Sequence, residues 1–219
     1  MITPRMIDHL VRTDYMVFIH RVFLTLNPGI PFAPSWHLDA MAEALARVHD
    51  GRETRLVIAV PPRSGKSIMT SIGFAAWRLG HDPRRRVICV SSEDSLVRSL
   101  AASFRAVVAS EWYRDAFPAF RIARGGDRAT ETVTTAGGYR FGVPLGGSVF
   151  GRGADLIIAD DAMSPQAALS ETVRRRELGL WDTKFPSRLN DKRTGAIVVV
   201  GQRLHEDDLV GHLTRENAA

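Results

Sequence analysis

The segment Val60-Pro61-Pro62-Arg63-Ser64-Gly65-Lys66-Ser67 constrains the fold more than any other part of the chain. It follows the apolar run 56–60 and precedes a helical pattern, so it predicts a strand, a loop and a helix in direct succession. In such a unit the loop amides and the helix N-terminus point at phosphate oxygens. The lysine reaches the outer phosphates, and the hydroxyl that follows it holds Mg²⁺.

The loop departs from the usual phosphate-binding pattern at its first position, where Val60 stands in place of glycine and two stiff prolines follow. A chance Gly-Lys-Ser at the start of a helix is the alternative, and the preceding strand argues against it. Arg63 either lies over the phosphates of its own subunit or faces solvent. The residues that we expect to bind nucleotide here are Pro62, Arg63, Ser64, Gly65, Lys66 and Ser67.

Length and composition indicate an ordinary globular protein with room for one α/β domain. The 219 residues are 45% hydrophobic and 24% charged, and no apolar run approaches the ~18 residues that span a bilayer. The single cysteine, Cys89, lies in an apolar run and is expected to be a buried structural thiol. Only three of the 29 basic residues are lysines, so arginine dominates a net charge of +5. This indicates either a nucleic-acid partner or the codon bias of a GC-rich genome.

The hydrophobic pattern predicts a parallel sheet covered by helices on both faces, a three-layer α/β fold. The predicted strands are apolar throughout and are separated by helices, which is typical of such sheets. Strands are predicted over 56–60, 87–91, 156–159 and 196–200, a hairpin over 130–147, and helices over 5–26, 36–48, 66–79, 95–110, 169–183 and from about 206. We expect a helical extension over 1–30, an ATPase domain over 31–213 and a tail over 214–219.

Polar residues directly follow all four predicted strands. Because the carboxyl ends of parallel strands meet at one edge of a sheet, these groups should lie close together and form the ligand site. They are Gly65-Lys66-Ser67, Ser91-Ser92, Asp160-Asp161 and Gln202-Arg203.

The acid pair Asp160-Asp161 predicts the second half of a Mg²⁺-dependent ATPase site. An acid at the end of an apolar strand anchors the metal opposite the loop hydroxyl, so Ser67 and Asp160 are the expected metal ligands. Asp161 stands where a general base would activate water. Two acids that cap a following helix are the alternative. The strand over 87–91, between loop and acids along the chain, favours the ASCE/RecA-like branch of P-loop NTPases.

Four further segments have weaker signals. Gln202, at the end of a strand, is expected to sense the γ-phosphate. Trp36 and His37 precede the first strand, where helicase-like ATPases hold adenine, although Trp36 could instead anchor the core. The cluster at 205–208 suggests metal ligands, but an acid-rich helix N-terminus is the better interpretation. Likewise, the run 174–176 either contacts DNA or forms a solvated helix face.

These motifs, in this order, resemble the ATPase domain of phage large terminases, the motors that package DNA. The resemblance rests on Pro-Ser-Trp-His-Leu at 34–38, Val-Pro-Pro-Arg-Ser-Gly-Lys-Ser at 60–67, Gly-Arg-Gly-Ala-Asp-Leu-Ile-Ile at 151–158, the acid pair, and Gln-Arg-Leu-His-Glu-Asp-Asp-Leu at 202–209.

The resemblance implies ATP hydrolysis that drives double-stranded DNA into a procapsid. It implies a pentameric ring on a portal protein, a small terminase subunit as partner, and action in the bacterial cytoplasm outside the mature virion, with no membrane partner. The isolated domain is expected to be monomeric. Arg152 matches the arginine that the family supplies to a neighbouring site. The family places a nuclease after the ATPase, and we expect it beyond residue 219 in a longer chain.

Three other functions remain open at the level of sequence. A helicase-like or DNA-repair ATPase would need a second RecA-like domain. A small-molecule kinase would usually place its phosphate loop near the N-terminus, whereas about 60 residues precede the loop here. A nucleotide-binding module without hydrolysis would not need the doubled acid at 160–161.

Overall fold

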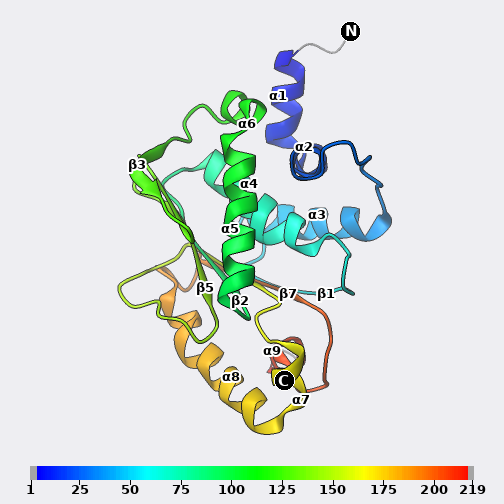
Figure 1. The fold of residues 1–219 in the computed structure, drawn as a ribbon, viewed down its shortest axis with the longest axis vertical. Coiled ribbons are helices and arrows are strands. Elements are labelled where there is room, and N and C mark those ends of the chain that lie inside the picture. The colour runs from blue at the N-terminus through cyan, green and yellow to red at the C-terminus, as the bar shows by residue number, and fades with distance from the viewer. Residues whose placement is uncertain (1–3, 217–219) are drawn as a thin grey trace.

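The protein, described here from a computed structural model over residues 4–216, forms three layers, with one sheet between two groups of helices (Figure 1). Helices α3, α4 and α5 lie on one side of the sheet, and α7, α8 and α9 lie on the other. The predicted three-layer α/β architecture is therefore confirmed.

The sheet has seven strands in the order β1-β7-β6-β2-β5-β4-β3. Neighbouring strands from β1 to β5 pair in parallel, whereas β4 and β3 are antiparallel and extend one edge. The strands are β1 (Arg55–Ala59), β2 (Arg86–Ser91), β3 (Ile122–Asp127), β4 (Glu131–Thr134), β5 (Tyr139–Pro144), β6 (Leu156–Asp160) and β7 (Ala196–Gly201).

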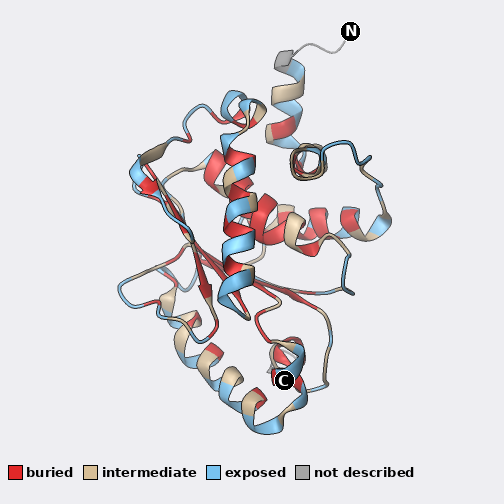
Figure 2. Ribbon diagram, in the orientation of Figure 1, coloured by how far each residue is buried: buried red, intermediate tan, exposed pale blue. Residues whose placement is uncertain are grey.

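Alternate residues of the central strands face two separate apolar cores, which explains why these strands are apolar throughout. In β6, Leu156 and Ile158 pack with the layer that contains α3 to α5, whereas Ile157 and Ala159 pack against α7 and α8. Figure 2 shows the central strands buried along their length, with exposed residues on the outer faces of the helices.

Helices of the first layer are α1 (Pro4–Thr13), α2 (Tyr15–Leu26), α3 (Trp36–His49), the π-helix η1 (Ile68–Phe74), α4 (Ala75–His81), α5 (Asp94–Ala109) and α6 (Glu111–Ala116). The second layer has α7 (Pro165–Leu169), α8 (Glu171–Lys184), the short 3₁₀ turn η2 (Pro186–Arg188) and α9 (Leu209–Glu216). Within the described residues no helix is long and apolar enough to cross a membrane.

All four predicted strands are confirmed, but the sheet is larger than predicted. The hairpin over 130–147 exists as β4 and β5 and joins the main sheet, so the sheet is mostly rather than wholly parallel. Strand β3 was not predicted, since its sequence Ile-Ala-Arg-Gly-Gly-Asp has one strand-forming residue, Ile122, and two glycines. Along the chain β2 lies between β1 and β6 as predicted, and in space β7 separates β1 from β6.

Two predicted helices differ from the structure for identifiable reasons. The helix over 5–26 divides at Asp14, whose carboxylate accepts hydrogen bonds from the amides of Met16 and Val17 and so caps α2. The predicted helix over 66–79 contains the π-helix η1, in which the Tyr15 hydroxyl and Arg140 donate to the carbonyls of Met69 and Ser71.

The N-terminal helices belong to the same core as the rest of the chain. Phe18, Ile19 and Val22 of α2 are fully buried among the residues of the first layer. At the other end, residues 214–216 of the predicted tail complete α9, and 217–219 lie outside the described residues.

Candidate functional site

The phosphate loop, the acid pair and Gln202 come together at the carboxyl edge of the sheet. They follow β1, β6 and β7, which are adjacent strands, with Ala59 opposite Gly201 and Asp160 opposite Val200. Two backbone bonds extend this alignment into the loops, from Val60 N to Gly201 O and from Asp161 N to Val200 O, both 3.0 Å. The predicted clustering of these groups is confirmed.

The backbone of the site is strained at two positions. Arg63 in the loop (φ 60°) and Asp161 after β6 (φ 44°) are the only non-glycine residues within 4–216 that have a positive φ. Such a conformation is unfavourable for a side chain with a Cβ, and it costs of order 1–3 kcal/mol when the surroundings impose it. Both residues lie at the predicted site.

Lys66 and Asp161 form an ion pair across the site, with 3.0 Å between Lys66 Nζ and Asp161 Oδ2. The lysine side chain is 8% exposed and the aspartate side chain 32% exposed. The lysine therefore already contacts the carboxylate that was predicted to be the base.

Asp160 is buried and lacks a partner. It is 1% exposed, and neither carboxylate oxygen has a hydrogen-bond partner within the described residues. Burial raises the pKa of Asp160 to about 6, and the adjacent hydroxyls of Ser67 and Ser71 offset part of the rise without meeting hydrogen-bond geometry. A buried carboxylate beside a hydroxyl supplies the hard oxygen ligands that Mg²⁺ prefers, so these residues fit the metal.

This lack of partners is unusual within the molecule. Six charged side chains among residues 4–216 are buried, and all but Asp160 and Arg140 lie within 4.0 Å of an opposite charge. The paired ones are Lys66 with Asp161, Glu131 with Arg152, Arg174 with Asp207, and Asp208 with Arg203. Arg140 faces the π-helix, where its Nε donates to the Ser71 carbonyl at 3.5 Å.

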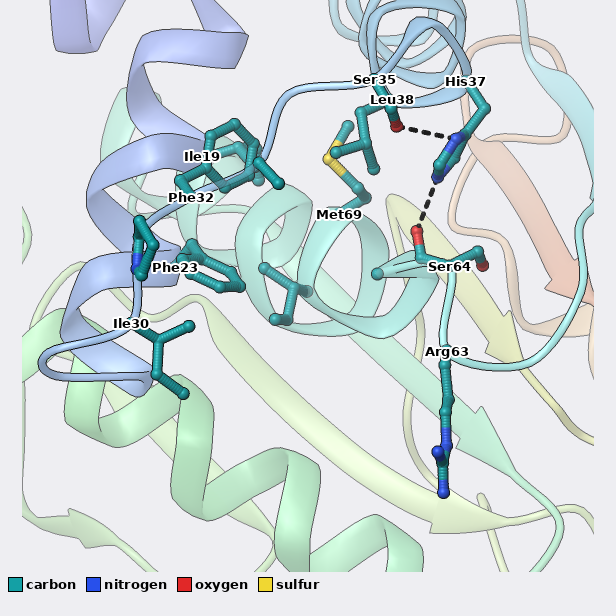
Figure 3. A pocket seen from close by; sticks show the side chains of 14 residues that line it. Ile19, Phe23, Ile30, Phe32, Ser35, His37, Leu38, Arg63, Ser64 and Met69 are labelled. Carbon is teal, nitrogen blue, oxygen red and sulfur yellow. Dashed lines mark hydrogen bonds between the residues drawn. The ribbon is translucent and has the colours of Figure 1, made fainter.

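A mainly apolar pocket of about 350 Å³ lies beside the phosphate loop (Figure 3). Its walls come from α2, residues 30–38, the loop and η1. His37 connects the pocket to the loop, since its Nε2 donates to the Ser64 carbonyl at 3.1 Å while its Nδ1 accepts from the Ser35 hydroxyl at 2.8 Å. A carbonyl can only accept, so the proton of the neutral ring is on Nε2.

Trp36 does not line this pocket, and the side chain of Arg63 extends away from it. The Trp36 side chain is 82% exposed and does not line the pocket, so its alternative interpretation as a core anchor is wrong. Arg63 contributes to the wall, but Figure 3 shows its guanidinium directed away from the cavity. Pro62, next to it, is exposed.

Gln202 is half-buried and lines a small cavity of about 20 Å³ together with Asp161. The residues that follow form a helix cap. The Asp208 carboxylate accepts from the amides of Leu204, His205 and Gly211, and no cluster of metal-ligating side chains occurs within the described residues. The acid-rich helix N-terminus was therefore the better prediction for 205–208.

Two arginines make contacts within the chain that the sequence did not predict. Arg174 of the run 174–176 is buried and donates to the Ala168 carbonyl at 2.6 Å, so only its two neighbours form a solvated face. Arg152 is not directed at the site of its own subunit. It forms a double hydrogen bond with Glu131 in β4, a residue that the sequence analysis did not single out.

Comparison with solved structures places the fold among phage large terminases. The structure of the HK97 bacteriophage large terminase aligns with 94% of this chain at 12% identity and a TM-score of 0.62. A point variant of the large terminase ATPase domain of Thermus phage P74-26 aligns with 82% of this chain, and with 68% of its own, at 17% identity and a TM-score of 0.50. No protein-family model and no curated protein matches the chain.

These comparisons support the predicted resemblance at the level of the fold. Both solved structures are large terminases, and the described residues share their mixed α/β architecture. The chain spans about two fifths of the length of the HK97 protein, since the alignment covers 41% of it.

Proposed function

We propose that residues 31–213 form a Mg²⁺-dependent ATPase domain of the P-loop, ASCE/RecA-like type, which hydrolyses ATP to ADP and phosphate. The observation that carries the proposal is Asp160, a fully buried carboxylate without partners beside Ser67 and across one strand from the phosphate loop. A protein interior rarely leaves a charge unpaired unless a ligand completes it.

Each part of the nucleotide has a candidate contact. The amides of Ser64, Gly65 and Lys66 and the ammonium of Lys66 bind the phosphates, and the exposed Arg63 adds positive charge from the same loop. The adenine enters the pocket beside His37, whose bond to Ser64 fixes the loop. Trp36, next to His37, is exposed and free to cover the base. Ser67 and Asp160 would hold Mg²⁺, which when bound would neutralise phosphate charge.

Asp161 is the proposed general base. In hydrolysis the water oxygen bonds to the γ-phosphorus, the bond to the β-phosphate oxygen breaks, and Asp161 accepts the proton of the water. Before Asp161 can act as the base, its ion pair with Lys66 must dissociate. Lys66 then binds the phosphate oxygens in place of the carboxylate. Gln202 directly follows β7, the strand between the loop strand and the acid strand, and its proposed role is to sense the γ-phosphate.

The proposed work of this ATPase is translocation of double-stranded viral DNA into a procapsid, in the host cytoplasm. The proposal includes a pentameric ring on the portal protein, a small terminase subunit as partner, and Arg152 as the arginine supplied to a neighbouring site. It rests on the resemblance of the motifs and on the fold shared with large terminases.

The test is ATP hydrolysis by the full-length protein, with Lys66→Ala and Asp160→Ala as the deciding variants. We expect both to lose activity by about 10²- to 10³-fold, because they remove the phosphate and metal contacts. Lys192→Ala is the matched control, since Lys192 is an exposed lysine in a surface turn. Hydrolysis at the wild-type rate by Lys66→Ala would exclude the phosphate-loop assignment.

A further inference from the structure

Arg152 is held within its own subunit by a two-point ion pair. Its Nη1 donates to Glu131 Oε1 and its Nη2 donates to Oε2, the latter at 3.2 Å. Its guanidinium also lies over the rings of Phe141, at 4.1 Å, and Tyr139, at 5.4 Å. The pair uses two of the five N–H donors of the guanidinium and neutralises its charge, so Arg152 in this state is a weak ligand for a phosphate on another subunit.

Release of Arg152 is unfavourable mainly because it leaves the buried carboxylate of Glu131 without its closest cation. The Glu131 side chain is 8% exposed, against 28% for that of Arg152, so the carboxylate is the more deeply buried partner. A buried carboxylate that loses its closest cation is strongly unfavourable, which favours the pair with Arg152. A release of Arg152 therefore needs a second cation near Glu131.

Arg128 is that second cation. Its Nη1 lies 3.5 Å from Glu131 Oε2, which is outside a strong contact, and its side chain is 70% exposed. The turn that carries it is fixed by Arg105 of α5, which donates to the carbonyls of Arg128 and Ala129 at 3.0 Å each. Arg128 can therefore close on Glu131 without a change in the backbone.

The backbone around Arg152 allows movement on one side only. Gly151 has a φ of 71° and open space around it, whereas Gly153 is enclosed. The Tyr139 hydroxyl donates to the Gly153 carbonyl, and a Cβ at Gly153 would stand 1.9 Å from the side-chain oxygen of Asn190. Arg152 thus turns about the segment before it, while the segment after it stays fixed.

We propose that Glu131 is a positioning residue that holds Arg152 in a resting ion pair, and that Arg128 takes over Glu131 when Arg152 turns to a phosphate group on the neighbouring subunit. This inference rests on the proposed role of Arg152 in the ring. It adds a carboxylate and a second arginine, both on the β3–β4 hairpin, to the residues that control hydrolysis.

The test compares Arg128→Gln with Arg124→Gln in the full-length protein assembled on its portal. Both residues are exposed arginines of the same hairpin, but Arg124 has no ion pair within the described residues. Arg128→Gln should lower kcat roughly two- to fivefold, the range for an exposed ion pair. Nucleotide affinity and Tm should stay at wild-type values. Arg124→Gln should leave all three unchanged.

The double variant Glu131→Gln, Arg128→Gln shows whether Arg128 acts through Glu131. In the Glu131→Gln background the effect of Arg128→Gln should disappear, and a persistent effect would overturn the proposal. If Glu131→Gln does not fold, the comparison of Arg128→Gln with Arg124→Gln decides alone, and equal kcat values overturn the proposal.

Arg152→Ala distinguishes a failure of the proposed role of Arg152 from a failure of this further inference. If Arg152→Ala is fully active in the ring, Arg152 does not have its proposed role. If Arg152→Ala is inactive and Arg128→Gln hydrolyses ATP at the wild-type rate, only the proposed role of Glu131 and Arg128 is excluded.

Discussion

Two buried carboxylates in the same sheet have opposite surroundings. Glu131 is 6% exposed and binds Arg152 through both oxygens, whereas Asp160 is 1% exposed and has no partner for either oxygen. The fold thus satisfies one charge internally and leaves the other for a ligand. The missing partner, more than burial or charge itself, distinguishes a binding site from a structural ion pair.

The backbone shows the same contrast. Around Glu131, the positive φ angles of the turns are on glycines, namely Gly125, Gly137 and Gly151. At the carboxyl edge Gly65 has a positive φ as well, but so do Arg63 and Asp161, where a side chain is kept despite the strain. Strain that is retained where glycine would relieve it indicates that the side chain has a function.

The largest expected effect comes from Asp161→Asn, which tests the carboxyl edge. Loss of a general base should lower ATP hydrolysis by about 10²- to 10⁴-fold. Nucleotide should bind more tightly, because Lys66 no longer pairs with a carboxylate at 3.0 Å. Steady-state hydrolysis and equilibrium binding of ATP measure the two effects separately. A wild-type rate would exclude Asp161 as the base.

The next test sets the two carboxylates directly against each other by unfolding the metal-free protein at pH 7. Asp160→Asn should stabilise the fold by about 3 kcal/mol, because a pKa raised from 3.8 to about 6 disfavours the buried charge by about 1.4 kcal/mol per unit. Glu131→Gln should instead destabilise it by about 3 kcal/mol, because Arg152 then loses its counter-charge.

Opposite signs for these two variants are the essential result. Glu53→Gln serves as the control, since Glu53 also pairs with an arginine, Arg47, but with a side chain that is 35% exposed. Its effect should stay within about 1 kcal/mol. If Asp160→Asn destabilises the protein as much as Glu131→Gln does, Asp160 has a structural role and the contrast between the two regions fails.

The sequence predicted the carboxyl edge of the sheet better than the contacts of the β3–β4 hairpin, for a physical reason. The edge is built from local signals, each an apolar strand followed at once by Gly65-Lys66-Ser67, Asp160-Asp161 or Gln202, and the parallel sheet brings them together. The Glu131–Arg152 pair joins residues 21 positions apart, and it depends on how β4 joins the sheet. A single acid in the pattern Thr-Glu-Thr-Val-Thr was the only trace of it.

The local backbone conformation at the site was also harder to predict than the order of its strands and helices. The motif indicates that a helix follows Ser67, but the π-helical turn arises from tertiary contacts. The Tyr15 hydroxyl donates to the Met69 carbonyl, and Arg140 donates to that of Ser71. Likewise, the sequence could not assign His37 to the Ser64 carbonyl, because that contact requires the folded approach of α3 to the loop.

The smallest expected effect comes from a third region, where the half-buried ring of His49 is uncharged at neutral pH. His49 lies against Trp77, with ring centroids 4.2 Å apart, and burial together with the charge of Arg78 lowers its pKa to about 4. The unfolded chain binds the proton at pH 6.5 and the folded chain only near pH 4, so stability is full above pH 6.5 and declines as the pH falls towards 4.

Thermal unfolding between pH 7 and pH 5 measures this decline. Because the ring is partly exposed, we reduce the effect to about 1 kcal/mol, or roughly 2–4 °C in Tm. His49→Gln should have a lower Tm at pH 7, through lost packing on Trp77, but a smaller further loss of Tm at pH 5.

Asp160 affects the pH dependence of stability with the opposite sign, because its pKa is raised and its burial becomes less unfavourable in acid. The Asp160→Asn protein should therefore lose more Tm between pH 7 and pH 5 than the wild type. An equal loss in both would mean that Asp160 is not a charged, unpartnered group at neutral pH, and the contrast with Glu131 would rest on geometry alone.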